Sequence, residues 1–281
     1  MVHGQVHSQP AKFSLSLNLP VYLRSFLVVA FLCLIWSAAA FADAADMERG
    51  MQYFRAKKYR EAIVYLQKGL YADPQCLKCR NALAVSLYKC GELQGSLTEF
   101  QKCLRIDPHA DINYKYVADI YIALGRRREA VTLYGELIAK EPKESSLYYG
   151  RGQALVGLLA YSQAVADYTK AIALEPKEDH YLIQRAVAYT KLKQYTKAIE
   201  DYSASIKMKP DRLDSYFGRG DCYMASGKYK LAIADFTAAI KQNPERTRGY
   251  VARAEAYEKN GQPDLALADR KKIKDRGETF D

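Results

Sequence analysis

The chain has 281 residues and a formal net charge of +10, with 42 lysines and arginines against 32 aspartates and glutamates. This length is typical of one or two domains. The basic excess is spread along the chain without a run of five or more like charges, which is typical of a solvated surface and gives little support for a nucleic-acid partner.

Residues 1–42 differ in composition from the rest of the chain. Lys12 and Arg24 are the only formally charged residues there, and an uncharged run of 18 residues extends from Ser25 to Ala42. The run ends in Ala-Phe-Ala, the small-x-small pattern that precedes a signal-peptidase site. A positive flank, an apolar middle and a small-residue exit together predict a secretory signal peptide that is cleaved after Ala42.

An uncleaved membrane anchor is the alternative interpretation of this segment. Eighteen apolar residues just reach the lower limit of the roughly 17–25 needed to cross a bilayer. Either interpretation predicts an exported protein in the periplasm or another extracytoplasmic compartment. Contact with a membrane is then expected only through residues 25–42, if they remain attached.

The remainder of the chain is an internal repeat with a period of 34 residues. Prolines recur at this spacing: Pro74, Pro108, Pro142, Pro176, Pro210 and Pro244. Small residues occupy the eighth position of every unit: Gly50, Ala84, Ala118, Gly152, Ala186, Gly220 and Ala254. The repeat defines seven units without an insertion: 43–76, 77–110, 111–144, 145–178, 179–212, 213–246 and 247–280. Such a period is the signature of a stacked repeat architecture.

Each unit is predicted to form two helices. In the fourth unit, Tyr148, Gly152 and Leu155 recur at helical spacing, and Ala164 and Tyr168 do so in the second half. Turn glycines at Gly91, Gly125, Gly227 and Gly261 and the recurring prolines mark the helix ends. Neither helix can bury its apolar stripe alone, so stability must come from stacking.

Four of the cysteines cluster in the first two units, at Cys76, Cys79, Cys90 and Cys103. A disulfide is allowed in an exported protein, and either Cys79–Cys103 or the local Cys76–Cys79 pair could form it. The spacings of 3, 11 and 13 residues do not match a paired zinc motif, and Arg80 stands where haem attachment requires histidine. A redox or metal-responsive module built on these four cysteines remains an alternative function.

Charged residues recur in phase in the last four units. The seventh position holds Arg151, Arg185, Arg219 and Arg253, and the twenty-third holds Asp167, Asp201, Asp235 and Asp269. Four copies at one phase predict a structural ladder of ion pairs rather than a catalytic pair, and each arginine could pair within its own unit or with the preceding one. Exposed pairs of this kind contribute about 0–1 kcal/mol each. The first three units lack complete pairs.

Residues that could form a catalytic centre are missing from the repeat region. His109 and His180 are its only histidines, and both fall in turns between units. No glycine-rich phosphate loop and no nucleophile beside a base can be recognised. The sequence therefore predicts a protein without enzymatic activity, without a cofactor or bound metal, and without a small-molecule substrate.

The period, the order of small, aromatic and proline positions, and the turn glycines closely resemble the tetratricopeptide repeat family. This resemblance covers the chain from Asp43 to about Glu278 and implies an all-α fold, a right-handed α-solenoid of seven helix-turn-helix units. Arg270 replaces the usual aromatic residue and Glu278 the proline in the last unit, which fits a terminal cap that faces water.

The family resemblance also implies a concave binding groove lined by the first helix of each unit. Carried over by position, the expected groove residues are Asn81, Lys115, Asp119, Tyr149, Gln153, Ile183, Val187, Phe217, Asp221, Val251 and Glu255. No unit has the Lys-then-Asn pair of the subclass that grips chaperone C-termini. Apolar residues followed by acids favour an extended or helical segment with apolar anchors and some basic character.

The sequence as a whole predicts an exported scaffold that binds a protein or peptide partner and supports the assembly of a cell-envelope or secretion complex. A nucleic-acid-binding helical repeat of the related 35-residue type is the remaining alternative. The strict 34-residue period and the export signal argue against it.

Overall fold

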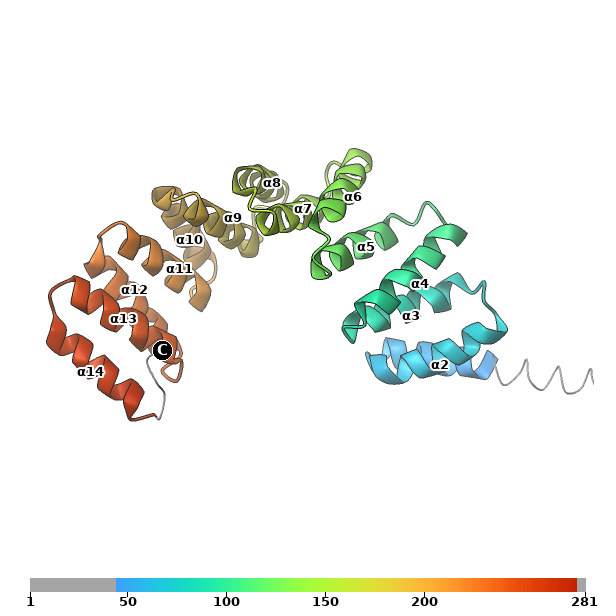
Figure 1. Cartoon of the computed structure of the whole chain (residues 1–281), viewed down its shortest axis with the longest axis horizontal. Coiled ribbons are helices and arrows are strands. Elements are labelled where there is room, and N and C mark those ends of the chain that lie inside the picture. Colours follow the sequence, from blue (N-terminus) through green and yellow to red (C-terminus); the bar gives the residue numbers. More distant parts are fainter. Residues whose placement is uncertain (1–43, 277–281) are drawn as a thin grey trace, which may run out of the picture. The chain divides into compact units, whose positions relative to one another are not determined.

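The computed structural model of the protein describes residues 44–276. The expected signal segment, residues 1–42, lies outside this range. Within the range the secondary structure is helical and contains no strand. Residues 44–55 are helical, and thirteen further helices, α2 to α14, follow them along the described chain (Figure 1).

The helices alternate with short turns from one end of this range to the other. Their bounds are α2 Tyr59–Ala72, α3 Leu77–Lys89, α4 Leu93–Ile106, α5 Asp111–Ala123, α6 Arg127–Lys140, α7 Ser145–Gly157, α8 Tyr161–Leu174, α9 Asp179–Lys191, α10 Tyr195–Met208, α11 Leu213–Ala225, α12 Tyr229–Gln242, α13 Thr247–Lys259 and α14 Pro263–Lys274. The chain divides into two compact units, the first ending at Ser86 and the second beginning at Leu87.

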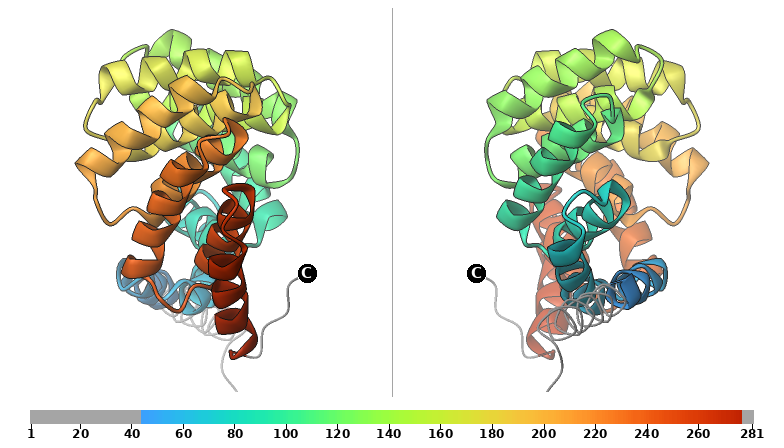
Figure 2. Two further views of the ribbon diagram at one scale, coloured as in Figure 1. Left: turned by 90° about the vertical axis from the view of Figure 1, so that its left-hand side faces the viewer. Right: turned by 90° about the vertical axis from the view of Figure 1, so that its right-hand side faces the viewer.

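The helices keep the 34-residue register of the sequence. From α3 onward, the first helix of each pair begins at the first residue of a repeat, for example at Leu77, Ser145 and Thr247. Within the second compact unit, each helix from α5 to α13 packs against the helix before it and the helix after it (Figure 1, Figure 2). The prediction of an all-α solenoid of helix-turn-helix repeats is confirmed.

In the fourth and sixth repeats, an aromatic ring of the core packs into a position left open by glycine. The ring of Tyr168 is fully buried, and a β-carbon added to Gly152 would lie only 2.6 Å from its Cε1 atom. Phe236 fills the same place opposite Gly220, where the corresponding distance is 2.5 Å. Because real β-carbons do not approach other atoms so closely, these two repeats require glycine at their eighth position.

The turn inside each repeat places its fifteenth residue in the left-handed region. The four glycines predicted there have φ between 70° and 82°. The same position is occupied by Lys57, Leu159 and Lys193 in the other repeats, with φ of 58°, 61° and 58°. Glycine adopts this conformation without steric cost, whereas a residue with a β-carbon does not.

The last helix, α14, differs from the other second helices, as a terminal cap should. Arg270 Nη1 lies 2.5 Å from Glu258 Oε1 at the position that is aromatic in most repeats. The outer face of α14 is not uniformly polar, because Leu265 and Leu267 are 45% and 66% exposed.

Candidate partner-binding surface

The recurring arginines and aspartates form four ion pairs, each within a single repeat. Arg185 is representative, since its Nε and Nη2 atoms donate to the two carboxylate oxygens of Asp201 at 2.8 and 2.7 Å. The equivalent pairs are Arg151–Asp167, Arg219–Asp235 and Arg253–Asp269. The four aspartate side chains are only 7–8% exposed, so these pairs are less exposed than the sequence suggested.

Three of these arginines also reach the preceding repeat. Arg185 Nη1 donates to the hydroxyl of Thr169 at 3.0 Å, Arg219 to Ser203 at 2.9 Å, and Arg253 to Thr237 at 3.1 Å. Arg151 faces Gly135 at the equivalent position, which has no hydroxyl to offer. The hydrogen bonds to aspartate raise the pKa of each of the four arginines further. Arg185, Arg219 and Arg253 therefore act as fixed cations that join two repeats.

On α7, the expected groove residue Tyr149 lies in an aromatic cluster. Its ring is half-buried and lies 5.9 Å from the ring of Tyr168, 5.0 Å from that of His180 and 5.2 Å from that of Tyr181. Exposed Gln153, one turn further along α7, donates from Nε2 to the Tyr149 hydroxyl at 3.0 Å. This cluster therefore leaves only part of the Tyr149 ring and the Gln153 amide accessible.

The residues of α9 at the same two positions, Ile183 and Val187, are half-buried. Both pack against the core formed by Ala186, Ala198 and Tyr202. Their side chains contribute to stacking and present only part of their apolar surface.

The ring of Phe217 on α11 does not line a surface, contrary to the expectation from the sequence. Phe217 is only 2% exposed and packs with Phe236 in the core between the sixth and seventh repeats. The guanidinium groups of Arg246 and Arg248 lie 5.1 and 4.5 Å from the centre of its ring. These two cations cover the ring, so it is unavailable to a partner.

The acidic residues expected near the C-terminal end line a pocket of about 360 Å³. Asp221 of α11 and Glu255 of α13 line it with apolar Met224 and Ala252 and with Lys259. Burial and the charge of Glu255 raise the pKa of Asp221, whereas Arg248, whose Nη2 lies 3.3 Å from Asp221 Oδ2, acts in the opposite direction.

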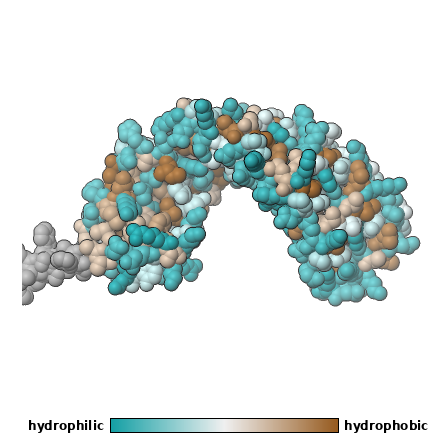
Figure 3. Space-filling model, turned by 180° about the vertical axis from the view of Figure 1, so that it is seen from behind, coloured by the Kyte–Doolittle hydropathy of each residue, from teal (hydrophilic) through white to brown (hydrophobic). Residues whose placement is uncertain are grey.

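Beside this pocket, Val251 on α13 is 41% exposed. Figure 3 shows hydrophobic residues as separate patches among hydrophilic ones on the face that it displays. Of the expected groove residues, Asp221, Val251 and Glu255 are exposed in this region.

In the third repeat, the two expected groove residues are half-buried and bonded to other side chains of the protein. Lys115 Nζ donates to Ser146 Oγ at 2.6 Å, and Asp119 accepts a hydrogen bond from the Tyr134 hydroxyl. Burial raises the pKa of Asp119, although the Tyr134 hydroxyl and Lys115 oppose this change. Asn81 belongs to the first compact unit and is half-buried.

Sequence reasoning missed a fully buried carboxylate, Asp179, at the start of α9. Its Oδ1 lies 2.5 Å from Lys209 Nζ, and its Oδ2 lies 2.6 Å from Arg212 Nη2. Burial acts to raise the pKa of Asp179, but the hydrogen bonds from Lys209 and Arg212 outweigh it and lower the pKa. The signal was weak, because this triad fastens the two ends of one repeat and does not recur in phase.

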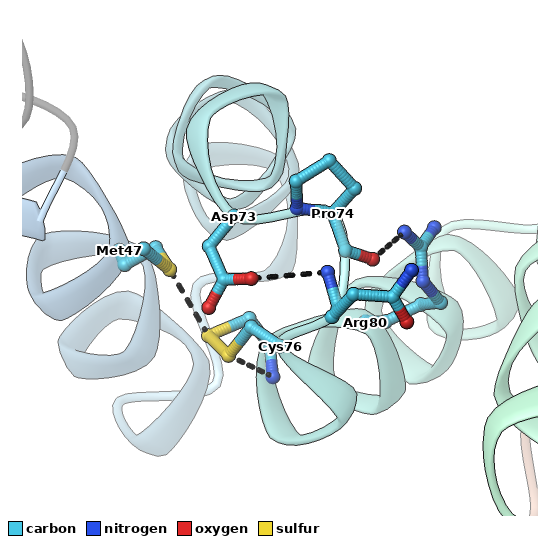
Figure 4. Close-up of a disulfide and its surroundings, with 7 residues drawn as sticks. Met47, Asp73, Pro74, Cys76 and Arg80 are labelled. Atoms are coloured by element: carbon cyan, nitrogen blue, oxygen red, sulfur yellow. Dashed lines mark hydrogen bonds between the residues drawn. A yellow bond between two sulfur atoms is a disulfide. The ribbon is translucent and has the colours of Figure 1, made fainter.

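The disulfide joins Cys76 to Cys79 and not Cys79 to Cys103 (Figure 4). The two α-carbons are 5.4 Å apart, a separation that a disulfide spans readily. Cys103 is buried within α4. Among residues 44–276, no group of three or more histidine, cysteine or acidic side chains is placed to hold a metal ion.

Over the described residues, no helix combines the length and apolar character that crossing a membrane requires. The possible anchor at residues 25–42 falls outside this range.

Comparison with known proteins places this arrangement among tetratricopeptide repeats. Models of the tetratricopeptide repeat family match residues 118–179, 179–212 and 213–246. Superkiller complex protein 3 of Homo sapiens is 29% identical over 117 residues, which are 42% of this chain and 8% of that protein. The chain therefore matches only a small part of the length of this relative.

Solved structures show the same fold along more of the chain. A tetratricopeptide repeat protein from Parabacteroides merdae has a TM-score of 0.65 and 21% identity, covering 84% of this chain and 94% of its own. YrrB, described as a tetratricopeptide repeat protein with an unusual peptide-binding site, has a TM-score of 0.53 and 18% identity. The match covers 73% of this chain and 97% of YrrB. At these identities the likeness concerns the fold.

Proposed function

Because the chain belongs to the tetratricopeptide repeat family, we propose that it is a non-enzymatic scaffold that binds a protein or peptide segment through the first helices of its repeats. The binding region that we propose comprises the pocket lined by Asp221 and Glu255, exposed Val251, and the accessible part of Tyr149 with Gln153. The partner is an extended or helical segment with a basic side chain and apolar anchors.

The observation that carries this proposal is the chemistry of the pocket between α11 and α13. Two carboxylates stand beside apolar Met224 and Ala252, which suits a side chain with a cationic head and an aliphatic stem. The chain's own Arg248 illustrates the fit, because its guanidinium lies 3.3 Å from Asp221 and 4.5 Å from the ring centre of Phe217. Since both Arg248 and Asp221 are about half exposed, a partner's arginine can compete for this carboxylate.

The relatives give coarser support. Tetratricopeptide repeats are protein-binding scaffolds as a family, and YrrB carries a peptide-binding site by its description. Because the likeness of YrrB to this chain is limited to the fold, the choice of Asp221 and Glu255 as binding residues is based on the geometry of this chain alone.

The experiment that tests the pocket is a pull-down from the native source with a double variant, Asp221→Asn and Glu255→Gln. We expect recovery of the specific partner to fall at least tenfold, because a basic side chain loses both carboxylates. The matched control is Glu200→Gln with Asp211→Asn, which removes the same charge at exposed positions outside the pocket. Equal recovery with both double variants, at unchanged thermal stability, would show that the partner binds elsewhere.

We further propose that the protein is exported and works in the assembly of a cell-envelope or secretion complex. The support is the signal-like segment at residues 1–42. N-terminal sequencing of the protein from its native source should find Asp43 as the first residue. An intact N-terminus in a membrane fraction would favour the anchor, and an intact N-terminus in the cytoplasm would refute export.

A further inference from the structure

The Cys76–Cys79 pair lies where a helix begins, and this position affects its chemistry. Cys76 directly precedes α3, and its carbonyl oxygen accepts a hydrogen bond from the Arg80 amide at 2.9 Å, so it occupies the N-cap. The amide of Cys79, the third residue of the helix, lies 3.3 Å from Cys76 Sγ and points its hydrogen at that sulfur. The Cys76 sulfur therefore takes the place of the side-chain oxygen that usually caps a helix.

A sulfur in this position is stabilised as a thiolate once the disulfide is reduced. A negative charge at a helix N-terminus is favoured by the helix dipole and by the unsatisfied amides of the first turn. Helix N-termini and Cys-x-x-Cys spacing are both conditions that lower a thiol pKa. Stabilising the reduced form makes a disulfide more oxidising, because reduction then releases more free energy.

Charged residues of the segment that carries the pair act in the same direction as the helix terminus. Asp73 is the acidic residue of the preceding turn, and its Oδ1 accepts the Gln75 amide at 3.0 Å. Lys78 and Arg80 of the first helical turn supply two positive charges, although Arg80 Nη2 donates to the Pro74 carbonyl at 2.5 Å (Figure 4). The segment from Asp73 to Arg80 thus carries more positive than negative charge.

The two sulfurs differ in their accessibility. Cys76 is half-buried, whereas Cys79 is only 5% exposed. The Sδ atom of Met47 lies 3.5 Å from Cys79 Sγ (Figure 4). Met47 in turn packs where Gly69 of α2 lacks a β-carbon, so it is held over Cys79. An incoming thiolate can therefore approach Cys76 and is kept from Cys79.

From this arrangement we propose that the Cys76–Cys79 disulfide is a thiol–disulfide exchange site that oxidises a dithiol of another polypeptide. The activity goes beyond partner binding and uses a region that the proposed binding pocket does not include. The roles of the two cysteines are unequal: Cys76 is the sulfur that is attacked, and Cys79 is the first leaving group.

The exchange balances in two steps. A substrate thiolate attacks Cys76 Sγ, the Cys76–Cys79 bond breaks, and the Cys79 thiolate leaves and takes up a proton. The second substrate thiolate then attacks the substrate sulfur of this mixed disulfide and releases Cys76 as a thiolate. Two electrons pass from the substrate to the protein, so the substrate dithiol becomes a disulfide while the protein disulfide becomes a dithiol.

The first experiment measures the reactivity of Cys76 in the reduced full chain. Iodoacetamide at pH 7 should alkylate Cys76 at least tenfold faster than it alkylates the same cysteine in a reduced peptide of residues 73–82, which lacks the folded helix. Peptide mass spectrometry identifies each cysteine, and Cys79 of the full chain should react more slowly than Cys76. Equal rates for Cys76 in chain and peptide would overturn the proposal.

The second experiment measures exchange itself, with glutathione as the probe. At equilibrium with mixtures of reduced and oxidised glutathione, the ratio of dithiol to disulfide should be at least tenfold higher in the full chain than in the peptide. The Cys79→Ser variant should accumulate a mixed disulfide on Cys76, and the Cys76→Ser variant should accumulate none on Cys79 over the same time. The Cys90→Ser variant is the control that should exchange like the unaltered chain.

Two results of this second experiment would refute the exchange site. One is an equilibrium ratio equal to that of the peptide. The other is a mixed disulfide that forms equally fast on either cysteine. Circular dichroism of each variant, compared with the unaltered chain, separates a loss of exchange from a loss of fold.

Discussion

The left-handed residue in each intra-repeat turn shows how a single side chain can oppose the conformation that the repeat imposes. Four repeats have glycine there, while Lys57, Leu159 and Lys193 adopt the same positive φ with a β-carbon. The left-handed conformation costs an ordinary residue about 1–2 kcal/mol. Stacking of the two helices outweighs this cost, so the turn keeps its shape in all seven repeats.

Replacing Leu159 by glycine should stabilise the protein. The substitution removes the left-handed strain, and the greater freedom of glycine in the unfolded chain offsets part of the gain, which leaves about 0.5–1 kcal/mol. Leu159 is largely exposed, so little buried contact is lost. A higher urea midpoint at an unchanged slope measures the effect. Leu158→Gly is the control that should destabilise, because Leu158 has a φ of −93°.

The ladder arginines should be sensitive even to lysine. Arg185→Lys keeps the charge but cannot bind both oxygens of Asp201 and the Thr169 hydroxyl together, so we expect a loss of about 1–3 kcal/mol. Arg151→Lys should cost less, because Arg151 faces Gly135 and has no hydroxyl bond to lose. The difference between the two losses, measured as shifts of the urea midpoint, gives the contribution of the Arg185–Thr169 hydrogen bond between repeats. Identical losses would mean that this bond contributes no stability.

At the scale of helix pairs, the sequence predicted best those features that recur from repeat to repeat. The 34-residue period placed the helix starts and the turns, and the repeated Arg and Asp positions predicted the ladder. Phe217 shows the limit of this reasoning, because residues outside its own helix, Arg246 and Arg248, decide its exposure. The disulfide was left between two choices, since sequence spacing alone does not give the separation of two side chains.

The triad around Asp179 ties the start of α9 to the turn after α10, and it predicts a dependence of stability on pH. The pKa of Asp179 is lowered from 3.8 in the folded state, so its carboxylate stabilises the fold at higher pH. Asp179→Asn should cost about 1–3 kcal/mol at pH 7, because the partners Lys209 and Arg212 are partly exposed. This difference in the free energy of unfolding should stay constant from about pH 7 to pH 5 and shrink below about pH 4.

Urea titrations of the unaltered chain and the Asp179→Asn variant at several pH values measure this dependence. A difference that does not shrink at all between about pH 4 and pH 2 would contradict the assigned ion pairs, because protonation of the unfolded chain alone should already reduce it. Asp211→Asn, an exposed change in the same turn, is the control that should alter stability little at any pH.

Across the whole protein, the regular repeats and the divergent repeats have different properties. The last four repeats carry the ladder and the acidic pocket, whereas the first compact unit carries the disulfide at the start of α3. A stacked repeat needs only its neighbours for stability, which leaves other positions free to vary. The partner-binding and thiol-exchange proposals therefore concern separate regions and can be tested independently.

The most direct test of the scaffold proposal places a photo-crosslinking residue, p-benzoylphenylalanine, at position 251 beside the pocket and, as a control, at position 230 on α12. Both native side chains, Val251 and Lys230, are exposed. We expect position 251 to capture a specific partner, position 230 to capture none, and the adduct to disappear when Asp221→Asn and Glu255→Gln are added. Capture from position 230 alone, or an adduct that these two substitutions leave unchanged, would contradict a partner bound at the pocket.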